Sequence, residues 1–418
     1  MSSLSKPREA ALKALYRCEK DGAYLNIALR DILASSNMEP RDNALATNIA
    51  FGVMKNRLFL DNIIANISSI KLKKLSVWIL NILRMGIFEL RFLDRIPESA
   101  TVNECVRLAR RYGHSASGGF VNAVLRKAAL SGDFLPDDTE SGEYISTKYS
   151  MPVWLVDLWK SQGHPIELFK AMNETPPVTV RLNTLKASGL GEDFEKTQDC
   201  EFSYRYKGSG SVENTEEFKN GAIAIQDAAS QRAIGAFGLE KGMRVLDLCS
   251  APGGKSAFMA QLMDNTGEII SCDIHSHKLA LIESNLNRLG VTNTRVMLND
   301  ATVFCPEFMC GFDAVLADVP CSGLGVIRRK SDIKWTKSEL GNDELVKIQR
   351  DILSNAVKYV KSGGKLMYST CTINKSENED NAKWILESFP EFLLIEQKQL
   401  MPHTDGTDGF FYAVFERK

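Results

Sequence analysis

The sequence predicts an α/β protein with three parts: an all-α first part, a small α+β segment and a larger, doubly wound parallel sheet. Up to about residue 135 the apolar residues recur at helical spacing almost throughout. From about residue 226 to the end, short apolar runs alternate with helical patterns, which is typical of a parallel sheet with helical crossovers. At 418 residues the chain is long enough for two to four domains of roughly 100–200 residues each.

Residues 1–135 are predicted to form a bundle of helices. Ala11, Leu12 and Leu15 recur at the spacing of one helix face, and the apolar residues of 79–93 repeat this pattern. The stretch 131–143 is rich in Gly, Ser, Asp and Pro and short of apolar residues. This composition predicts a linker after the helical part.

Charge separates the first part from the remainder of the chain. The net charge of the whole chain is −1, but residues 1–140 carry 20 Lys and Arg against 15 Asp and Glu. This excess favours, weakly, a nucleic-acid partner. Five basic residues gather around the string GGFVNAVLRK, and both a solvated helix face and an RNA contact would account for them. They are Arg107, Arg110, Arg111, Arg126 and Lys127.

A smaller α+β segment is predicted over residues 136–225. Pro152 marks the start of a helix whose apolar stripe includes Trp154 and Trp159. The string PPVTVRLNTLK, residues 176–186, then alternates like a strand.

Residues 226–418 are predicted to form the doubly wound sheet, with short right-handed crossovers. The last two apolar runs lie close together, which suggests an antiparallel final strand. Strands are expected near residues 243–248, 268–273, 294–298, 312–317, 364–369, 392–396 and 410–415, with helices between the first six.

The stretch DLCSAPGGK, from Asp247 to Lys255, is the centre of this third part. Its glycine pair, Gly253 and Gly254, lies between a predicted strand and a predicted helix. Such a turn brings bare backbone amides and a helix N-terminus close to a ligand, as in folds that bind nucleotide-like cofactors. A nucleoside also needs an acid at the end of the second strand for its ribose hydroxyls, and Asp273 holds that position. The spacing fits neither a dinucleotide fingerprint nor a phosphate-binding loop.

Two cysteines follow predicted strands of the same sheet. Cys321 lies in DVPCSGLG, and Cys371 lies in YSTCT. Open parallel sheets carry their sites just beyond the carboxyl ends of the strands, so both thiols are expected at the edge that holds the glycine turn. A thiolate in such a polar, partly exposed site is a strong nucleophile.

These strings together resemble the S-adenosylmethionine-dependent RNA cytosine-5 methyltransferases, most closely the bacterial RsmB (Sun/Fmu) type that acts on 16S ribosomal RNA. The resemblance covers all of residues 226–418. It implies a Rossmann-like methyltransferase sheet, S-adenosylmethionine as the cofactor and 16S ribosomal RNA as the partner. The residues that it places at the cofactor are Cys249, Ser250, Ala251, Pro252, Gly253, Gly254, Lys255, Asp273, Asp300 and Asp318.

The resemblance also implies a covalent mechanism, in which a thiolate adds to carbon 6 of cytosine and so makes carbon 5 nucleophilic. In the RNA enzymes the cysteine of a Thr-Cys dipeptide, here Cys371, is the nucleophile. The cysteine of the Pro-Cys dipeptide, here Cys321, helps to release the product. Asp318 is the acid expected near the ring nitrogen and amino group of the base. Arg328 and Arg329 are expected either to meet phosphates or to close the site.

The first 130 residues or so resemble the RNA-binding domain of NusB, through the strings GAYLNIALRDIL, TVNECVRLARRYG and FVNAVLRK. This implies an RNA-docking module. In the family the middle segment resembles an RNA-recognition fold, and Arg181 and Asn183 match its Arg-x-Asn string, but a contact of these two residues with RNA stays open. The expected domains are 1–135, all-α and NusB-like; 136–225, linker and small α+β segment; and 226–418, methyltransferase.

Composition bounds the compartment and the partners. Nine cysteines without regular pairing argue against a disulfide scaffold and for the cytoplasm. The sequence predicts no signal peptide, no membrane span and, because no Cys or His pair has zinc spacing, no metal. A monomer is expected. Two alternatives stay open: a transfer-RNA cytosine-5 methyltransferase with the same catalytic residues, and a catalytically idle RNA-binding assembly factor.

Overall fold

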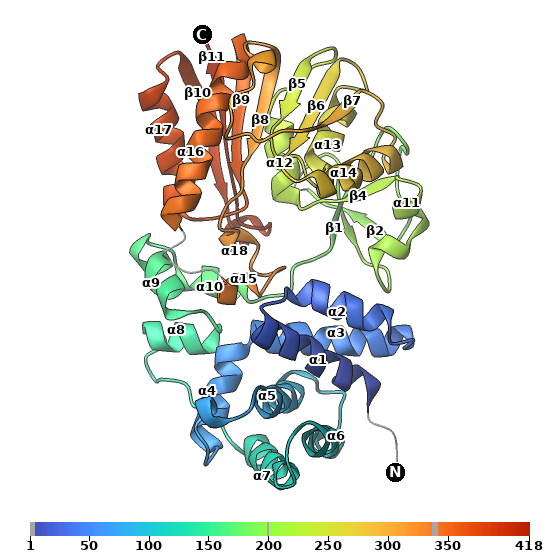
Figure 1. Cartoon of the computed structure of the whole chain (residues 1–418), viewed down its shortest axis with the longest axis vertical. Coiled ribbons are helices and arrows are strands. Elements are labelled where there is room, and N and C mark those ends of the chain that lie inside the picture. Colours follow the sequence, from blue (N-terminus) through green and yellow to red (C-terminus); the bar gives the residue numbers. More distant parts are fainter. Residues whose placement is uncertain (1–4, 199, 337–341) are drawn as a thin grey trace. The chain divides into compact units, whose positions relative to one another are not determined.

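The computed structural model describes residues 5–198, 200–336 and 342–418. The chain divides into two compact units (Figure 1). The first, the helical unit, comprises Met1–Asn173 and Lys330–Thr336, and the second, the sheet unit, comprises Glu174–Arg329 and Lys337–Lys418. The chain therefore leaves the helical unit after residue 173 and returns to it for one short segment.

The helical unit has the helices that the apolar spacing predicts. Ala11, Leu12 and Leu15 are buried in one core with residues such as Leu83 and Ile87. The unit continues past the expected linker, so the boundary expected at residue 135 falls inside it. Its helices are α1 (Lys6–Asp21), α2 (Leu25–Ala34), α3 (Pro40–Lys55), α4 (Arg57–Ile67), η1 (Leu72–Lys74), α5 (Val77–Phe92), α6 (Glu98–Tyr112), α7 (Ser117–Leu130), α8 (Gly142–Lys148), α9 (Val153–Ser161), α10 (Ile166–Met172) and α15 (Ile333–Thr336).

The returning segment, Lys330–Thr336, is held by polar contacts with helix ends. The side chain of Lys334 is fully buried, and its Nζ donates to Lys55 O, at the C-terminus of α3, at 2.9 Å and to Ser150 O at 2.8 Å. Trp335 Nε1 donates to Met54 O at 3.0 Å. Because unpaired carbonyls at a helix end need donors, this segment completes the C-terminus of α3.

Lys334 should make the stability of the helical unit depend on pH. Burial, and secondarily the charge of Lys55, lower the pKa of Lys334 to about 7, whereas an unfolded lysine titrates near 10.4. Between these values the unfolded chain binds more protons than the folded chain, so the free energy of unfolding should rise with pH. The slope should approach about 1.4 kcal/mol per pH unit and should disappear in Lys334→Met.

Denaturant unfolding at pH 7, 8 and 9 measures the difference in the free energy of unfolding between the wild type and Lys334→Met. Lys330→Met, at an exposed lysine, is the control. A constant difference across the three pH values would show that the two carbonyls keep the ammonium group charged.

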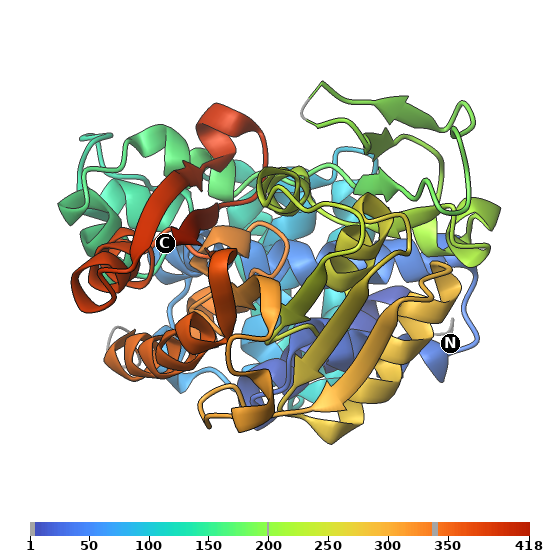
Figure 2. The ribbon, with the colours of Figure 1, turned by 90° about the horizontal axis from the view of Figure 1, so that it is seen from above.

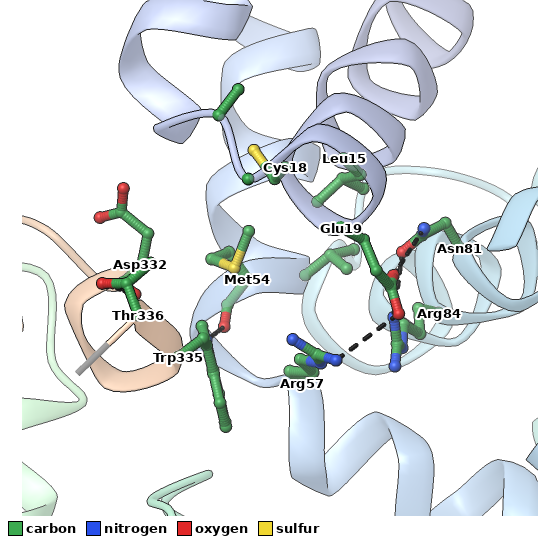
Figure 3. A pocket seen from close by; sticks show the side chains of 13 residues that line it. Leu15, Cys18, Glu19, Met54, Arg57, Asn81, Arg84, Asp332, Trp335 and Thr336 are labelled. Carbon is green, nitrogen blue, oxygen red and sulfur yellow. Dashed lines mark hydrogen bonds and ion pairs between the residues drawn. The ribbon is translucent and has the colours of Figure 1, made fainter. Parts of the chain in front are cut away.

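A cavity of about 240 Å³ lies in the helical unit (Figure 3). Glu19 in its wall pairs with the buried Arg84 at 2.9 Å and with Arg57 at 3.5 Å, and the guanidinium group of Arg57 lies 5.2 Å from the ring of Trp335. On the other side Asp332 accepts a hydrogen bond from Leu25 N. The charged groups of the wall are thus largely paired with one another.

The sheet unit begins with a small antiparallel sheet in the order β2-β3-β1-β4. The predicted strand within 176–186 is its strand β1, and all four residues of β1 are buried. The elements of this part are β1 (Thr179–Leu182), β2 (Phe194–Lys196), β3 (Ser203–Tyr206), η2 (Val212–Asn214), α11 (Glu216–Lys219) and β4 (Ile223–Ile225).

Arg181 and Asn183 are interior residues, and neither side chain faces outward toward RNA. The guanidinium group of Arg181 is fully buried, 4.4 Å from the ring of Phe258, and burial lowers its pKa to about 9. Asn183 Nδ2 donates to Gly221 O and to Leu289 O, both at 2.8 Å. The Arg-x-Asn string therefore joins the small sheet to the elements that carry the cofactor turn.

The large sheet has the order β10-β11-β9-β8-β5-β6-β7. All neighbours pair in parallel except β11, which is antiparallel to β9 and β10, as the closely spaced last runs suggest. The predicted Rossmann-like sheet is thus confirmed. Its strands are β5 (Arg244–Asp247), β6 (Glu268–Asp273), β7 (Thr294–Leu298), β8 (Phe312–Asp318), β9 (Val360–Thr370), β10 (Phe392–Leu400) and β11 (Phe410–Arg417), and its twist is visible from above (Figure 2).

Helices cover both faces of the large sheet. Successive strand residues point to opposite faces, so Val245 joins the core under α12–α14 while Leu246 joins the core under α16 and α17. The remaining elements are α12 (Ala228–Ala236), α13 (Gly254–Leu262), α14 (Ser276–Arg288), η3 (Pro306–Phe308), η4 (Leu324–Val326), α16 (Asn342–Tyr359), η6 (Lys375–Glu377), α17 (Glu379–Ser388) and α18 (Pro402–Asp405).

Candidate active site

The order of the strands places a switch point between β5 and β8. From β5 the chain proceeds to β6 and β7 on one side, whereas β8 and β9 lie on the other. In such sheets ligands bind in the crevice outside the carboxyl ends of the strands at this point. The glycine turn follows β5 and Asp318 ends β8, so both predicted motifs flank the switch point.

The glycine turn has the geometry that the sequence predicts. Gly253 precedes α13 with φ +95°, a conformation that L side chains rarely adopt, and its N donates to Ser250 O at 2.6 Å. Ser250 N and Oγ both bond to Cys272 O, at 2.8 and 3.0 Å. The turn is therefore tied to strand β6, with the N-terminus of α13 beside it.

A cavity of about 300 Å³ opens at this turn. Five of the ten residues expected at the cofactor line it, namely Cys249, Ala251, Asp273, Asp300 and Asp318. The other five, Ser250, Pro252, Gly253, Gly254 and Lys255, are not part of the lining and belong to the turn and the first residues of α13. The rest of the lining consists of Leu248, Ile274, His275, Lys278, Asn299, Ala301, Thr302, Val319, Pro320, Ile348 and Ile352.

The two expected acids lie at the ends of neighbouring strands. Asp273 ends β6, is 6 % exposed, and accepts a hydrogen bond through Oδ1 from His275 N at 3.0 Å. Asp300 lies two residues beyond β7 and accepts from Thr302 N at 2.9 Å and from Thr302 Oγ1 at 2.7 Å. A glycine cradle beside carboxylates that accept from hydroxyl groups fits a nucleoside cofactor.

Asp247, the last residue of β5, holds the first turn of α13 through a buried hydrogen bond with Ser256, a role that sequence reasoning missed. It is fully buried, and Ser256 Oγ donates to its Oδ2 at 2.6 Å, while Ser271 Oγ donates to Ser256 Oγ at 2.8 Å. Burial is the main cause that raises the pKa of Asp247 to about 7. The aspartate opens the motif string, but which serines it meets depends on how β6 and α13 pack.

The two predicted cysteines meet. Cys321 Sγ and Cys371 Sγ are hydrogen-bonded at 3.2 Å, although 50 residues separate them in the chain. The hydrogen bond with Cys371, burial and the negative charges of Cys371 and Glu377 raise the pKa of the Cys321 thiol. The two thiols are thus hydrogen-bonded to each other at the carboxyl edge of the sheet, and either sulfur can be the donor.

Asp318 links the thiols to the cofactor turn. Its Oδ2 lies 2.6 Å from Lys255 Nζ, and its Oδ1 accepts from Ser369 Oγ at 2.8 Å. Burial lowers the pKa of Lys255. The charge and hydrogen bond of Asp318, and then the charges of Cys371 and Asp247, together outweigh burial, so the pKa of Lys255 is raised overall. Lys255, expected at the cofactor, is thus a cation beside Asp318 and Cys371.

The loop after Cys321 is locked to the end of the chain. Gly325 N donates to Cys371 O at 3.0 Å, and Gly409 N donates to Gly325 O at 2.9 Å. A Cβ at Gly325 would lie 1.9 Å from Gly409 O, so only glycine fits there.

Arg328 and Arg329, expected either to meet phosphates or to close the site, both pair with acids of the protein itself. Both guanidinium groups pair with Asp408, at 2.7 and 2.5 Å, and Arg329 also pairs with Asp227 at 2.8 Å. Asp408 is 3 % exposed. A buried carboxylate between two arginines leaves these arginines engaged within the protein rather than directed at phosphates.

None of the helices over residues 5–198, 200–336 and 342–418 combines the length and apolar character needed to span a bilayer. Over the same residues, no three His, Cys, Asp or Glu side chains gather into a group that could hold a metal ion.

A seven-stranded sheet with one antiparallel strand, a glycine turn after β5 and an acid after β6 define the class: the protein is an S-adenosylmethionine-dependent methyltransferase. Comparison with known proteins agrees. Residues 236–416 match the family model described as 16S rRNA methyltransferase RsmB/F, and residues 5–130 match that of the NusB family. A probable ribosomal RNA small subunit methyltransferase B of Bacillus subtilis is 33% identical, over 98% of each chain. The chain belongs to this family, the ribosomal RNA small subunit methyltransferases B.

Solved structures show the same fold. A crystal structure described as that of PH0851 superposes with a TM-score of 0.82 at 27% identity and covers 100% of both chains. A methyltransferase homolog protein from Pyrococcus horikoshii has a TM-score of 0.58 at 27% identity, covering 67% of this chain and 99% of its own. The predicted fold class and cofactor are thereby confirmed.

Binding of the cofactor should depend on Asp273. Asp273→Ala removes the acid that is expected to accept from the ribose hydroxyls, and it should weaken S-adenosylmethionine binding by about 1.5–3 kcal/mol. That is roughly 10- to 150-fold in Kd, measured by calorimetry. The exposed Asp264→Asn, which removes the charge that pairs with Lys241 and keeps a residue that tolerates the left-handed backbone at this position, is the control. Unchanged affinity in a folded Asp273→Ala protein would remove this residue from the site.

Proposed function

We propose that the protein transfers a methyl group from S-adenosylmethionine to carbon 5 of a cytosine in 16S ribosomal RNA, through a covalent adduct of a cysteine with carbon 6. The observation that carries this proposal is the pair of thiols in contact, Sγ to Sγ 3.2 Å, beside the Asp318–Lys255 ion pair at the cofactor turn. One thiol suffices for addition to the base. A second at hydrogen-bond distance is what the release step requires.

Carbon 5 of cytosine is too weak a nucleophile to take a methyl group unaided. The thiolate of Cys371 adds to carbon 6, which turns the ring into an enamine and makes carbon 5 nucleophilic. Addition pushes charge onto the ring nitrogen and amino group, and Asp318 can act as the acid there by passing on a proton from the Lys255 ammonium group, which it contacts at 2.6 Å. S-adenosylmethionine, when bound, supplies an electrophilic methyl group.

Release requires that the proton on carbon 5 leaves and that the bond between carbon 6 and sulfur breaks. Once Cys371 is bound in the adduct, its hydrogen bond and its negative charge no longer raise the pKa of Cys321. Cys321 then loses its thiol proton to solvent and, as the thiolate, removes the carbon 5 proton. The electron pair freed at carbon 5 re-forms the ring double bond and expels Cys371 as a thiolate. The assignment of Cys371 as nucleophile, Cys321 as release residue and Asp318 as acid rests on this geometry and on the family.

The remaining assignments complete the proposal. Residues 1–135 dock the RNA, supported by the match of 5–130 to the NusB family; 136–225 connect; and 226–418 carry out the transfer. The target cytosine lies in open RNA, because a stacked, paired base cannot present carbon 6 to a thiol. The protein acts as a monomer in the cytoplasm, where the thiols stay reduced.

The position of methylation is tested with RNA that carries tritium on carbon 5 of cytosine. Each transfer should release one tritium atom to water for each methyl group incorporated from labelled S-adenosylmethionine. Methyl incorporation without tritium release would exclude carbon 5. The same assay with 16S ribosomal RNA and with transfer RNA separates the candidate substrates. Tritium release from transfer RNA alone would identify a transfer-RNA methyltransferase. Tritium release from neither RNA would favour a catalytically idle assembly factor.

A further inference from the structure

A buried carboxylate, Glu377, lies directly behind the two thiols. It is fully buried and accepts hydrogen bonds from Ser322 Oγ at 2.5 Å, Ser322 N at 2.9 Å, Gln349 Nε2 at 2.9 Å and Asn374 Nδ2 at 3.1 Å. Gln349 Nε2 also donates to Pro320 O at 3.0 Å, so the chain is held on both sides of Cys321. Sequence reasoning missed Glu377, although it stands six residues after Cys371 in the polar string Glu377-Asn378-Glu379.

Glu377 reaches the two cysteine loops unequally. It bonds directly to the backbone and hydroxyl group of Ser322, the residue after Cys321. It reaches Thr372, the residue after Cys371, through Ser322 Oγ, 2.7 Å from Thr372 Oγ1, and through Asn374, which donates to both Glu377 and Thr372. Its negative charge is thus fixed next to Cys321.

The charges around the thiol pair differ in sign on the two sides. On the Cys371 side Lys255 of α13 is the cation, paired with Asp318 of β8, and the charge of Cys371 contributes to raising the pKa of Lys255. On the Cys321 side the charge of Glu377 contributes to raising the pKa of Cys321, after the hydrogen bond and burial. A negative charge disfavours a neighbouring thiolate, and a positive charge favours it. Tyr368 of β9 and Arg350 of α16 also face this side, and Tyr368 bonds to Glu377 O.

We propose that Glu377 is a positioning residue that keeps Cys321 protonated before addition, so that Cys371 is the thiol of the pair that ionises. This inference rests on the proposed function, in which Cys371 is the nucleophile. It explains why a carboxylate is fully buried at this position, although burying a charge has a desolvation penalty that a neutral side chain would avoid. It also gives the two otherwise similar thiols their different roles.

A purely structural role needs to be separated from this one, because the three N–H donors aimed at Glu377 already require an acceptor. Glu377→Gln removes the charge and turns one acceptor into a donor. Glu377→Asp keeps the charge but shortens the side chain. A structural role makes both variants alike, whereas the charge role sets them apart.

The experiment measures alkylation of Cys321 by iodoacetamide against pH in the full-length Cys371→Ala protein, read by mass spectrometry of the Cys321 peptide. The Cys371→Ala background removes the contribution of the other sulfur. Adding Glu377→Gln should lower the pH midpoint of Cys321 alkylation by about one unit or more, because a negative charge has gone. Adding Glu377→Asp should leave the midpoint near its original value, as should the control Glu379→Gln, two residues away.

Activity and folding complete the test. With both cysteines present, Glu377→Gln should lower kcat by at least tenfold, while the Kd for S-adenosylmethionine stays near that of the wild type. Equal pH midpoints of Cys321 alkylation in Glu377→Gln and Glu377→Asp would overturn the charge role. If Glu377→Gln does not fold, the midpoint in Glu377→Asp still tests the proposal, because a large shift in this variant, which keeps the charge, would contradict it. The proposed function fails by a different result, which is methylation by the Cys371→Ala protein.

Discussion

Cys371→Ala is expected to abolish both methylation and any covalent link to RNA, whereas Cys321→Ala is expected to accumulate a protein–RNA adduct. Without Cys371 nothing adds to carbon 6, although the cofactor cavity, in whose wall this cysteine has no part, should bind S-adenosylmethionine normally. Without Cys321 the addition and the methyl transfer remain possible. The adduct then persists, because the residue that removes the carbon 5 proton is missing.

Incubation of each variant with substrate RNA and S-adenosylmethionine, followed by denaturing gel electrophoresis, compares the two assignments directly. Cys310→Ala, which removes an exposed thiol away from the site, is the control and should behave like the wild type. An adduct with Cys371→Ala and none with Cys321→Ala would reverse the two roles. An adduct with neither variant would leave Cys321 without a role in release.

The second large effect is expected at the Asp318–Lys255 pair. Asp318→Asn keeps the size of the side chain but removes the carboxylate that Lys255 Nζ contacts at 2.6 Å. Proton transfer to and from the base should suffer, and kcat should fall by about 10²- to 10⁴-fold, the usual contribution of a positioned acid or base. Because Asp318 also lines the cofactor cavity, a smaller change in Kd should accompany the loss.

The same strand supplies a matched control for this substitution. Asp313 lies near the other end of β8 and pairs with Lys361 at 2.8 Å. Asp313→Asn therefore removes an equivalent carboxylate–lysine pair on β8 away from the switch point, and it should leave kcat near that of the wild type. If Asp313→Asn lowered kcat as much as Asp318→Asn, the effect would reflect stability of the strand rather than chemistry. Single-turnover methyl transfer measures both.

Much of the site could be predicted because its signals are local in the chain. The glycine turn, Asp273 and the two cysteines each follow an apolar run, and a residue just after a parallel strand lies at the carboxyl edge wherever that strand is placed. Their meeting at one edge therefore needed only the correct order of strands and helices. The antiparallel β11 was within reach for the same reason, since a short connection between strands favours an antiparallel pair.

Other features depend on contacts between distant segments. Arg181 and Asn183 match a string associated with RNA, yet both are buried because β1 packs against the elements that carry the cofactor turn. Arg328 and Arg329 resemble phosphate ligands until Asp408, about 80 residues later, is found between them. A charge pattern gives the number of donors but not the acceptor that each donor meets.

The sequence by itself determined the class of fold, the cofactor turn and the two cysteines at the strand ends, since strand and helix periodicity and strand-end positions depend on neighbouring residues. Tertiary structure alone decided that the two thiols lie 3.2 Å apart, that Lys255 turns to Asp318, that Lys334 completes the end of α3 and that Glu377 lies behind Cys321. The physical reason is that each of these contacts joins segments that only the packing of the folded chain brings within hydrogen-bond distance, where burial and nearby charges then set the proton on each group.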